Sequence, residues 1–166
     1  MYRTTYDSPI GLMTMESDGE ALTGLWMGAA KPSGGAIPYI IDSALPVFRQ
    51  AAQWLDGYFG GEDAEMDVPL RLVGTPFQQA VWDLLLDIPF GEVTTYGALA
   101  EKVAQSRGSR VSAQAVGGAV GRNPVLILVP CHRVIGADGS LTGYAGGLDC
   151  KRWLLEHETD VVSRQL

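Results

Sequence analysis

Residues 94–121 read TTYGALAEKVAQSRGSRVSAQAVGGAVG, and this stretch decides how the C-terminal half of the chain folds. Apolar residues at helical spacing predict one helix that begins at Thr94 or Thr95 and ends at a loop over Gln105–Ser109. A further helix is predicted from about Ser112. Two short helices joined by a short loop are typical of a helix-turn-helix, although most such pairs merely pack together.

The second of these helices is unusually rich in small residues, with Gly117 and Gly118 side by side. A glycine inside a helix costs about 1 kcal/mol relative to alanine, so something should offset this cost. Close packing against another helix is one explanation. Approach to DNA is another, because a helix with its side chains is about 10–12 Å across and the minor groove is only about 6 Å wide. A helix reduced to small residues suits a widened minor groove.

The whole chain is predicted to be an α/β protein of the α+β kind with two domains, residues 1–74 and 75–166. The first domain is β-rich and carries no catalytic constellation, whereas the second opens with a helix that Thr75 caps and Pro76 begins. The elements expected in the first domain are strands over Tyr2–Tyr6, Gly11–Glu16 and Ala21–Met27, a loop at Lys31–Gly35, a helix over Asp42–Phe59 and a strand near Met66–Leu72.

Composition excludes several classes of protein. With 46% apolar and 19% charged residues among 166, the chain should fold and not remain disordered. Its two cysteines form no CxxC pair, which disfavours both a disulfide framework and a thiolate zinc cluster. The N-terminus lacks an apolar signal core, and the longest apolar run, Val125–Pro130, is too short to cross a bilayer. We therefore expect a cytoplasmic protein that does not associate with membranes.

The charge is unevenly distributed along the chain. The net charge of −7 argues at first against nucleic acid as a partner. Residues 1–74 hold 4 basic and 10 acidic side chains, whereas residues 75–166 hold 8 and 9. Between Lys102 and Ala137 there are five basic residues and no acid. A solvated face is the simpler interpretation, because five charges are few for tight DNA binding through phosphate contacts alone.

Residues 129–135, VPCHRVI, contain the strongest candidate for a catalytic nucleophile, a cysteine followed by histidine and arginine. A thiolate is the nucleophilic form of cysteine, and a free thiol with a pKa of about 8.5 is mostly protonated at neutral pH. His132 and Arg133 can favour the anion of Cys131. If the segment is extended, neighbouring side chains point to opposite faces, so His132 would act as a base through one water. An acid elsewhere should orient the imidazole. Cys150 is interpreted as a buried structural residue.

The sequence around Cys131 resembles the family of O6-alkylguanine-DNA alkyltransferases, also called methylated-DNA–protein-cysteine methyltransferases. Pro130-Cys131-His132-Arg133 is similar to their active-site signature, and the resemblance covers about the last ninety residues. The first domain resembles the family more loosely, as a small β-sheet domain with a ribonuclease-H-like layout. The other stretches that carry the resemblance are Thr75–Trp82, Gly91–Tyr96, Ala115–Ala119, Asn123-Pro124, Gly143–Leu148 and Trp153–Glu158.

The resemblance implies a direct DNA-repair reaction. Cys131 would take the alkyl group from O6-alkylguanine, with O4-alkylthymine as a further candidate substrate, and His132 would act as its base through water. A thioether has no easy route to hydrolysis, so each molecule would act once and would need no metal or organic cofactor. The remaining catalytic residues that the resemblance implies are Glu158, which orients His132; Asn123, which braces the turn of Cys131; Tyr96, which lies near guanine N3; and Lys151, which assists.

The resemblance also implies how DNA is bound. The partner would be double-stranded DNA carrying alkylated bases, the protein would be a monomer, and the target base would leave the stack to reach the thiol. Gln114 stands where many members have an intercalating arginine, so Arg110 is a candidate to replace it. The base pocket would be formed by Tyr144, by the backbone carbonyls of Cys131 and Val134, and by the N–H of Ala145, where serine is common. The residues expected to contact DNA are Gln114, Ala115, Gly117, Arg110 and Arg133.

Some expectations depart from the family, and two other functions stay open. Some relatives carry a structural zinc in the first domain, but residues 1–74 contain neither Cys nor His, so we expect none here. A DNA-binding module that senses lesions without repairing them is an alternative, although such members lack the nucleophilic cysteine. A Cys–His hydrolase would need a direct thiol–imidazole contact and an oxyanion hole. Trp82 and Trp153 are predicted to be core residues, and His157 is predicted to be exposed.

Overall fold

A computed structural model of the chain describes residues 1–31 and 37–165. The chain divides into two compact units, each described here by itself: residues 1–73 together with 124–126 form the first, and the rest forms the second. The predicted boundary had placed residues 124–126 in the second domain. They join the first unit because Leu25 donates its N–H to the carbonyl of Pro124 at 2.9 Å and accepts from the N–H of Leu126 at 3.1 Å.

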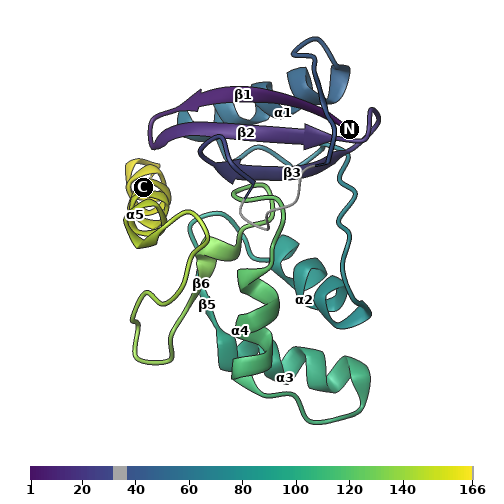
Figure 1. Cartoon of the computed structure of the whole chain (residues 1–166). Helices are drawn as coiled ribbons and strands as arrows, with labels where there is room; N and C mark the ends of the chain where they lie inside the picture. Colours follow the sequence, from purple (N-terminus) through teal and green to yellow (C-terminus); the bar gives the residue numbers. More distant parts are fainter. Residues whose placement is uncertain (32–36, 166) are drawn as a thin grey trace. The chain divides into compact units, whose positions relative to one another are not determined.

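The first unit is built on a four-stranded sheet in the order β3-β2-β1-β4. Figure 1 shows β1, β2 and β3 side by side. The strand β1 (Tyr2–Ser8) forms an antiparallel hairpin with β2 (Gly11–Ser17), and β2 pairs in the same way with β3 (Leu22–Met27). The helix α1 (Pro46–Phe59) packs against these three strands. The three predicted strands are therefore confirmed to within two residues at each end.

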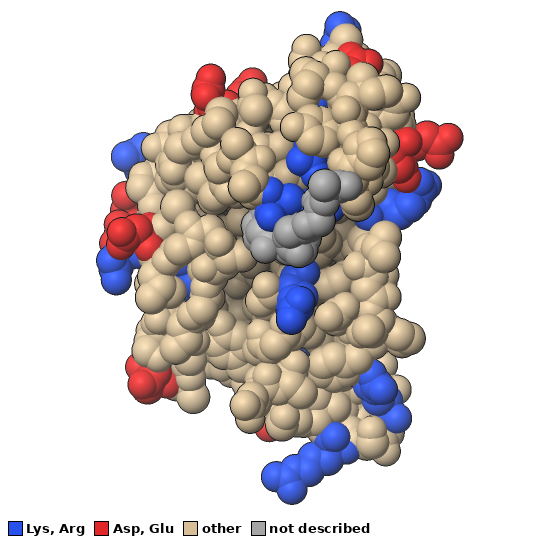
Figure 2. Space-filling model, viewed as in Figure 1, with Lys and Arg blue, Asp and Glu red and all other residues tan. Residues whose placement is uncertain are grey.

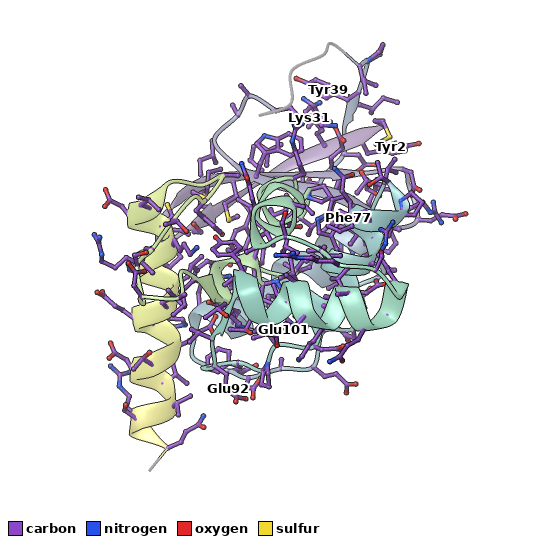
Figure 3. The ribbon with its side chains drawn as sticks, turned by 90° about the horizontal axis from the view of Figure 1, so that it is seen from below. Tyr2, Lys31, Tyr39, Phe77, Glu92 and Glu101 are labelled. Atoms are coloured by element: carbon purple, nitrogen blue, oxygen red, sulfur yellow. The ribbon has the colours of Figure 1, made fainter. Side chains whose placement is uncertain are left out.

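One face of this sheet buries apolar side chains, and the other buries a cluster of charged ones. Met13 and Met15 on β2 are at most 1% exposed and contribute to the apolar core. Glu16 points to the other face, since side chains alternate along a strand, and it accepts from Arg3 at 2.9 Å and from Lys31 at 2.8 Å. Lys31 and Tyr39 lie near each other in Figure 3, and the ring of Tyr39 stacks under Arg3 at 4.1 Å. The charges of this cluster are paired within the unit.

Three predictions for the first unit need correction. The helix α1 begins at Pro46 and not at Asp42, whose carboxylate accepts from the N–H of Ala44 in the preceding turn. Residues 66–72 form no strand beyond one bridge to Leu22, because Pro69 lacks the N–H that a ladder needs. The short strand β4 (Ile40–Ile41), parallel to β1, was not predicted. Of the predicted loop at 31–35, residues 32–35 lie outside the described residues.

The second unit begins with α2 (Pro76–Leu86), which starts where it was predicted to start. Thr75 accepts from the N–H of Gln78 at 3.1 Å and donates its own N–H to the Gln78 side chain at 3.0 Å, a capping box. Trp82 on this helix is 1% exposed, as predicted for a core residue, and its indole N–H donates to the carbonyl of Ala119 at 2.9 Å.

The predicted pair of short helices is present. After β5 (Thr94–Thr95), the helix α3 (Tyr96–Arg107) is capped by Thr95 and ends at Gly108, whose φ of 71° is left-handed. The helix therefore continues three residues into the predicted loop. The helix α4 (Ala113–Gly121) follows, and its N-cap Ser112 accepts from the N–H of Ala115 at 3.1 Å. The two helices pack on each other and on α2.

The rest of the second unit comprises the 3-10 turn η1 (Cys131–Arg133), β6 (Val134–Ile135) and α5 (Leu148–Arg164). Trp153 was predicted to be a core residue and His157 to be exposed, but both are half-buried on α5. Their rings stack with their centres 4.9 Å apart, because the two residues lie one helical turn apart. Cys150 is also half-buried instead of buried. In the part of the chain that the structure describes, no helix is long and apolar enough to cross a membrane.

Candidate active site

A two-stranded parallel ladder in the second unit brings the Cys131 turn next to the start of α3. The strands β5 and β6 pair Thr94 with Val134 and Thr95 with Ile135. Tyr96 directly follows β5, and the turn η1 that contains Cys131 directly precedes β6. The segment is not extended, so the condition considered for it is not met: Val134 donates its N–H to the carbonyl of Cys131 in a 3-10 turn.

Asn123 links the end of α4 to the turn of Cys131. Its side-chain amide donates to the carbonyl of Val129 at 2.8 Å, and its side chain also hydrogen-bonds the Cys131 thiol. Between them the chain passes through Ile127, a buried β-branched residue with a φ of 70°. Such a conformation is rare for isoleucine and requires support from its surroundings. Asn123 precedes Ile127 and both partners of its amide follow it, so these bonds tie the two ends of the segment together and supply part of this support.

Burial controls the acidity of Cys131, which is 4% exposed. Burial raises the pKa of the thiol to about 11, against the lowering effects of the Asn123 hydrogen bond and of the positive charge of Lys151. The expectation that His132 and Arg133 favour the anion is therefore wrong. The thiol is protonated at neutral pH, and the cation that acts on it is Lys151, which α5 contributes and which is itself fully buried.

His132 and Glu158 form a buried pair, with Nε2 of His132 2.5 Å from Oε2 of Glu158. Burial raises the pKa of Glu158, but hydrogen bonds and charges from His132 and Arg133 outweigh it and hold this pKa at about 2. A carboxylate only accepts, so Nε2 carries the imidazole proton and Nδ1 carries the lone pair. Nδ1 is buried without a hydrogen-bond partner among the described residues. Burial also lowers the pKa of His132, so its neutral ring can accept a proton at Nδ1.

Arg133 faces the interior, so the prediction that it contacts DNA is wrong. Its Nε donates to Oε1 of Glu158 at 2.8 Å, its Nη2 donates to Oε2 at 3.2 Å, and its Nη1 donates to the carbonyl of Ile88 at 2.7 Å. The residue is 8% exposed. A guanidinium held in this way is not available to a phosphate.

Tyr96 and Lys151 meet at one carbonyl oxygen, that of Thr142. The hydroxyl of Tyr96 donates to it at 2.9 Å, and the ammonium of Lys151 donates to it at 3.1 Å and to the carbonyl of Gly143 at 3.4 Å. The same ammonium lies 5.9 Å from the centre of the Tyr96 ring. The structure thus gathers Tyr96, Lys151 and Cys131 around the loop that joins β6 to α5.

The three residues predicted to hold the base lie on and next to this loop. Val134 is fully buried in β6, Tyr144 is half-buried and Ala145 is exposed. The carbonyl of Tyr144 accepts from the N–H of Gly147 at 2.9 Å, which closes a turn before α5. Their contacts with a base stay a prediction.

The face predicted to contact DNA is formed by α4 and the loop before it. Gln114, Ala115 and Arg110 are exposed, and Figure 2 shows basic side chains in the region that Figure 1 assigns to α3 and α4. A Cβ on Gly117 would meet the Tyr96 ring at 3.7 Å, an ordinary contact, whereas a Cβ on Gly118 would have nothing within 4 Å. Packing within the described part of the chain therefore does not account for Gly118.

The site also uses backbone groups that the sequence did not reveal, among them the carbonyls of Ile88 and Thr142 and the N–H of Gly91, which donates to Oε1 of Glu158 at 3.0 Å. Backbone atoms carry no residue-type signal. Gly91 offers the one available hint, because its φ is 80° and a Cβ there would lie 2.5 Å from Val162. No group of three or more His, Cys, Asp or Glu side chains is arranged to hold a metal within the described ranges.

A helix-turn-helix unit that carries a buried thiol beside a neutral imidazole defines a class of DNA-binding protein with a reactive cysteine. Two family models match the chain: "6-O-methylguanine DNA methyltransferase, DNA binding domain" over residues 76–160, and "6-O-methylguanine DNA methyltransferase, ribonuclease-like domain" over residues 1–72. The chain belongs to this family of DNA-repair methyltransferases. The predicted family and α+β fold are confirmed.

Relatives match over nearly their full length. A methylated-DNA–protein-cysteine methyltransferase of Mycobacterium tuberculosis is 48% identical over 157 residues, which cover 95% of this chain and 91% of the relative. One from Haemophilus influenzae is 42% identical and is covered to 86%. The crystal structure of the Mycobacterium tuberculosis protein OGT in complex with DNA is 46% identical with a TM-score of 0.84, covering 97% of this chain and 94% of that one.

Proposed function

We propose that this protein repairs O6-alkylguanine in double-stranded DNA by moving the alkyl group to the sulfur of Cys131, once per molecule. Membership of the family supports transfer to a cysteine, and the surroundings of Cys131 support this residue as the acceptor. The observation that carries the assignment is the buried pair of His132 and Glu158, which leaves Nδ1 of a neutral imidazole free to take a proton. O4-alkylthymine is a second candidate substrate.

The first step of the proposed reaction is activation of the thiol. Its pKa of about 11 means that the resting sulfur holds its proton at neutral pH. Nδ1 of His132 accepts this proton through one bridging water, and Glu158 stabilises the imidazolium that forms. The amide of Asn123 and the charge of Lys151, which both lower the pKa of Cys131, stabilise the thiolate.

The second step is displacement at the alkyl carbon. The sulfur of Cys131 forms a bond to this carbon while the bond from carbon to O6 breaks, and its electron pair stays on the guanine. The hydroxyl of Tyr96, near N3, gives its proton to the departing guanine anion and regains one from the ammonium of Lys151. Solvent then takes the proton left on His132 and returns one to Lys151. The product is a thioether and restored guanine, and the reaction consumes no cofactor.

Access of the base to Cys131 requires the target nucleotide to leave the helical stack. We propose that α4 approaches the minor groove with Ala115 and Gly117 on its surface, and that Gln114 or Arg110 fills the space the base leaves. Tyr144 then forms one wall of the pocket, with the carbonyl of Val134 and the N–H of Ala145 on the base edge. The protein acts as a monomer, and a reducing cytoplasm keeps its thiol available.

Mass spectrometry tests this proposal directly. Mixing the protein with an excess of duplex DNA that contains one O6-methylguanine should add about 14 Da to the peptide that holds Cys131, because CH₃ replaces the thiol hydrogen. The transfer should stop at one equivalent per protein. Cys150→Ser should react as the wild type does, because the second cysteine is not part of the site.

Cys131→Ser should bind the same duplex and acquire no methyl group. Binding of lesion DNA by folded wild-type protein without methylation of Cys131 would instead support the lesion-sensing alternative. Multiple-turnover ester hydrolysis would support a hydrolase, although the hydrogen-bond partner of the thiol is the side chain of Asn123 and not the His132 imidazole.

Gly118 offers a test of how α4 meets DNA. Gly118→Ala should raise the free energy of unfolding by up to about 1 kcal/mol, because alanine favours a helix and the added Cβ meets nothing within 4 Å. The same change should weaken binding to duplex DNA, since the Cβ enters the space between helix and groove. Urea denaturation and fluorescence anisotropy measure the two effects.

Ser163→Ala is the matched control for Gly118→Ala, because it improves helix propensity at an exposed position of α5. It should leave the DNA affinity unchanged. Equal affinity of Gly118→Ala and wild type for DNA would contradict a close approach of α4 at this residue.

A further inference from the structure

Arg133 is fixed on both sides of its guanidinium. Two of its nitrogens face the two oxygens of Glu158, at 2.8 Å and 3.2 Å, in a bidentate arrangement. The third nitrogen donates to the carbonyl of Ile88 at 2.7 Å, just after α2, and the guanidinium lies 5.7 Å from the centre of the Phe90 ring. The surrounding backbone and ring hold the guanidinium against the carboxylate independently of His132.

Among the described residues, at least four hydrogen-bond donors lie around Glu158. Besides the two from Arg133, Oε1 accepts from the N–H of Gly91 at 3.0 Å, and Oε2 faces Nε2 of His132 at 2.5 Å. Glu158 is 1% exposed, so water contributes little to its charge balance. Arg133 is therefore the positive charge that compensates this buried carboxylate.

The protonation of His132 depends on this balance. The charged groups that face it are Glu158 and Lys151 from α5 and Arg133 from its own turn. Glu158 favours the imidazolium, whereas Arg133 and Lys151 oppose it, and burial also favours the neutral ring. Without Arg133, the buried carboxylate would draw a compensating proton onto the pair that it forms with His132.

We propose that Arg133 is a positioning residue for alkyl transfer. Its charge compensates that of Glu158, so the carboxylate orients His132 without drawing an extra proton onto the imidazole, and Nδ1 stays free to accept the proton of Cys131. This inference rests on the proposed role of His132 as the base. The positioning role takes the place of the DNA contact that the sequence predicted for Arg133. Arg133 acts through Glu158 and His132, and it touches neither the substrate nor the reacting sulfur.

Arg133→Met and Arg133→Lys test the proposal. The rate of methyl transfer from O6-methylguanine duplex DNA is measured under single-turnover conditions across the pH range from about 6 to 10, within which imidazole titrates when its pKa is raised. Arg133→Met should be slower by tenfold or more at neutral pH and should recover at high pH, because its imidazole must first lose a proton. Arg133→Lys should recover part of the rate, since it keeps the charge without the bidentate geometry.

Two controls separate this role from others. Arg152→Met removes an exposed arginine from α5 and should leave the pH profile as in the wild type. The affinity of Arg133→Met for unmodified duplex DNA should equal that of the wild type within a factor of about two, because a buried side chain contributes no phosphate contact. A loss of affinity without a displaced pH profile would overturn the proposal in favour of a DNA contact. A rate that falls equally at every pH would overturn it in favour of a purely structural role.

Nitrogen NMR of His132 keeps the test independent of transfer. In wild-type protein at neutral pH, His132 should be neutral with its proton on Nε2, and in Arg133→Lys a larger fraction should be imidazolium. This comparison does not need Arg133→Met to fold, and it does not need methyl transfer. If the wild type fails to methylate Cys131, only the proposed function is contradicted, and the NMR comparison still tests the role of Arg133. An imidazolium in the wild type, or identical titration in the two proteins, would overturn the inference.

Discussion

Replacing Glu158 with alanine should lower the free energy of unfolding by about 3–5 kcal/mol, the usual cost of removing one partner from a buried ion pair. The change leaves the guanidinium of Arg133 buried without a counter-charge and deprives His132 of the group at its Nε2. Methyl transfer should also slow by about 10²-fold or more, because an unoriented base loses much of what general base catalysis contributes. Urea denaturation and single-turnover kinetics with O6-methylguanine duplex DNA measure the two losses.

Glu156→Ala provides the matched control, since it removes an exposed carboxylate from the same helix two residues away. Its free energy of unfolding should stay within about 0.5 kcal/mol of the wild type, as for most surface substitutions. Glu158→Gln should fall between the two, because the amide keeps the shape but not the charge. If Glu158→Ala is as stable and as active as Glu156→Ala, the buried pairing of Glu158 with His132 and Arg133 supports neither the fold nor the reaction.

Local signals made most of the second unit predictable from sequence. Thr75 and Ser112 are polar residues placed directly before apolar-periodic segments, and both cap helices in the structure. By contrast, the two-residue strand β4 and the segment 124–126 pair with strands far away in the chain. Segments this short have no periodicity of their own, so only the completed fold determines where they pair.

The reactive residues of the site were easier to predict than their energetics. Cys131 and His132 stand next to each other, and the resemblance to known alkyltransferases pointed to Glu158. The direction of the Cys131 pKa shift depends on burial, which a list of neighbouring charges does not contain. Arg133 was misplaced for a related reason: a guanidinium suits a phosphate and a carboxylate equally well, and only the position of Glu158 decides between them.

The second large effect concerns Cys131 at alkaline pH. The unfolded thiol loses its proton above its ordinary pKa of 9.0, whereas the folded thiol keeps it up to about 11. Between these values the unfolded chain binds fewer protons than the folded protein, so the free energy of unfolding falls as the pH rises. A difference of two pKa units corresponds to about 3 kcal/mol. This stabilisation is fully present below pH 9.0 and is lost as the pH approaches 11.

Cys131→Ser should abolish this alkaline loss, because serine does not titrate in the range. Tyr6, whose pKa is raised by burial and by Asp56, contributes a loss in the same direction, but it is present in every variant and cancels in the comparison. Cys150→Ser should keep the loss that Cys131 causes. Urea denaturation at intervals from pH 8, about one unit below the window, to its upper end near pH 11 measures the difference between the variants.

The repaired form of the protein gives the same test by a chemical route. S-methylcysteine at position 131 cannot ionise, so protein treated with one equivalent of O6-methylguanine duplex should lose the part of the alkaline destabilisation that belongs to Cys131. Its curve of unfolding free energy against pH should then follow that of Cys131→Ser. If the methylated protein and Cys131→Ser both lose stability as steeply as the wild type does, the resting thiol is not held in its protonated form by burial. The folded thiol would then titrate near its ordinary pKa of 9.0, and His132 would have a more acidic proton to remove than burial predicts.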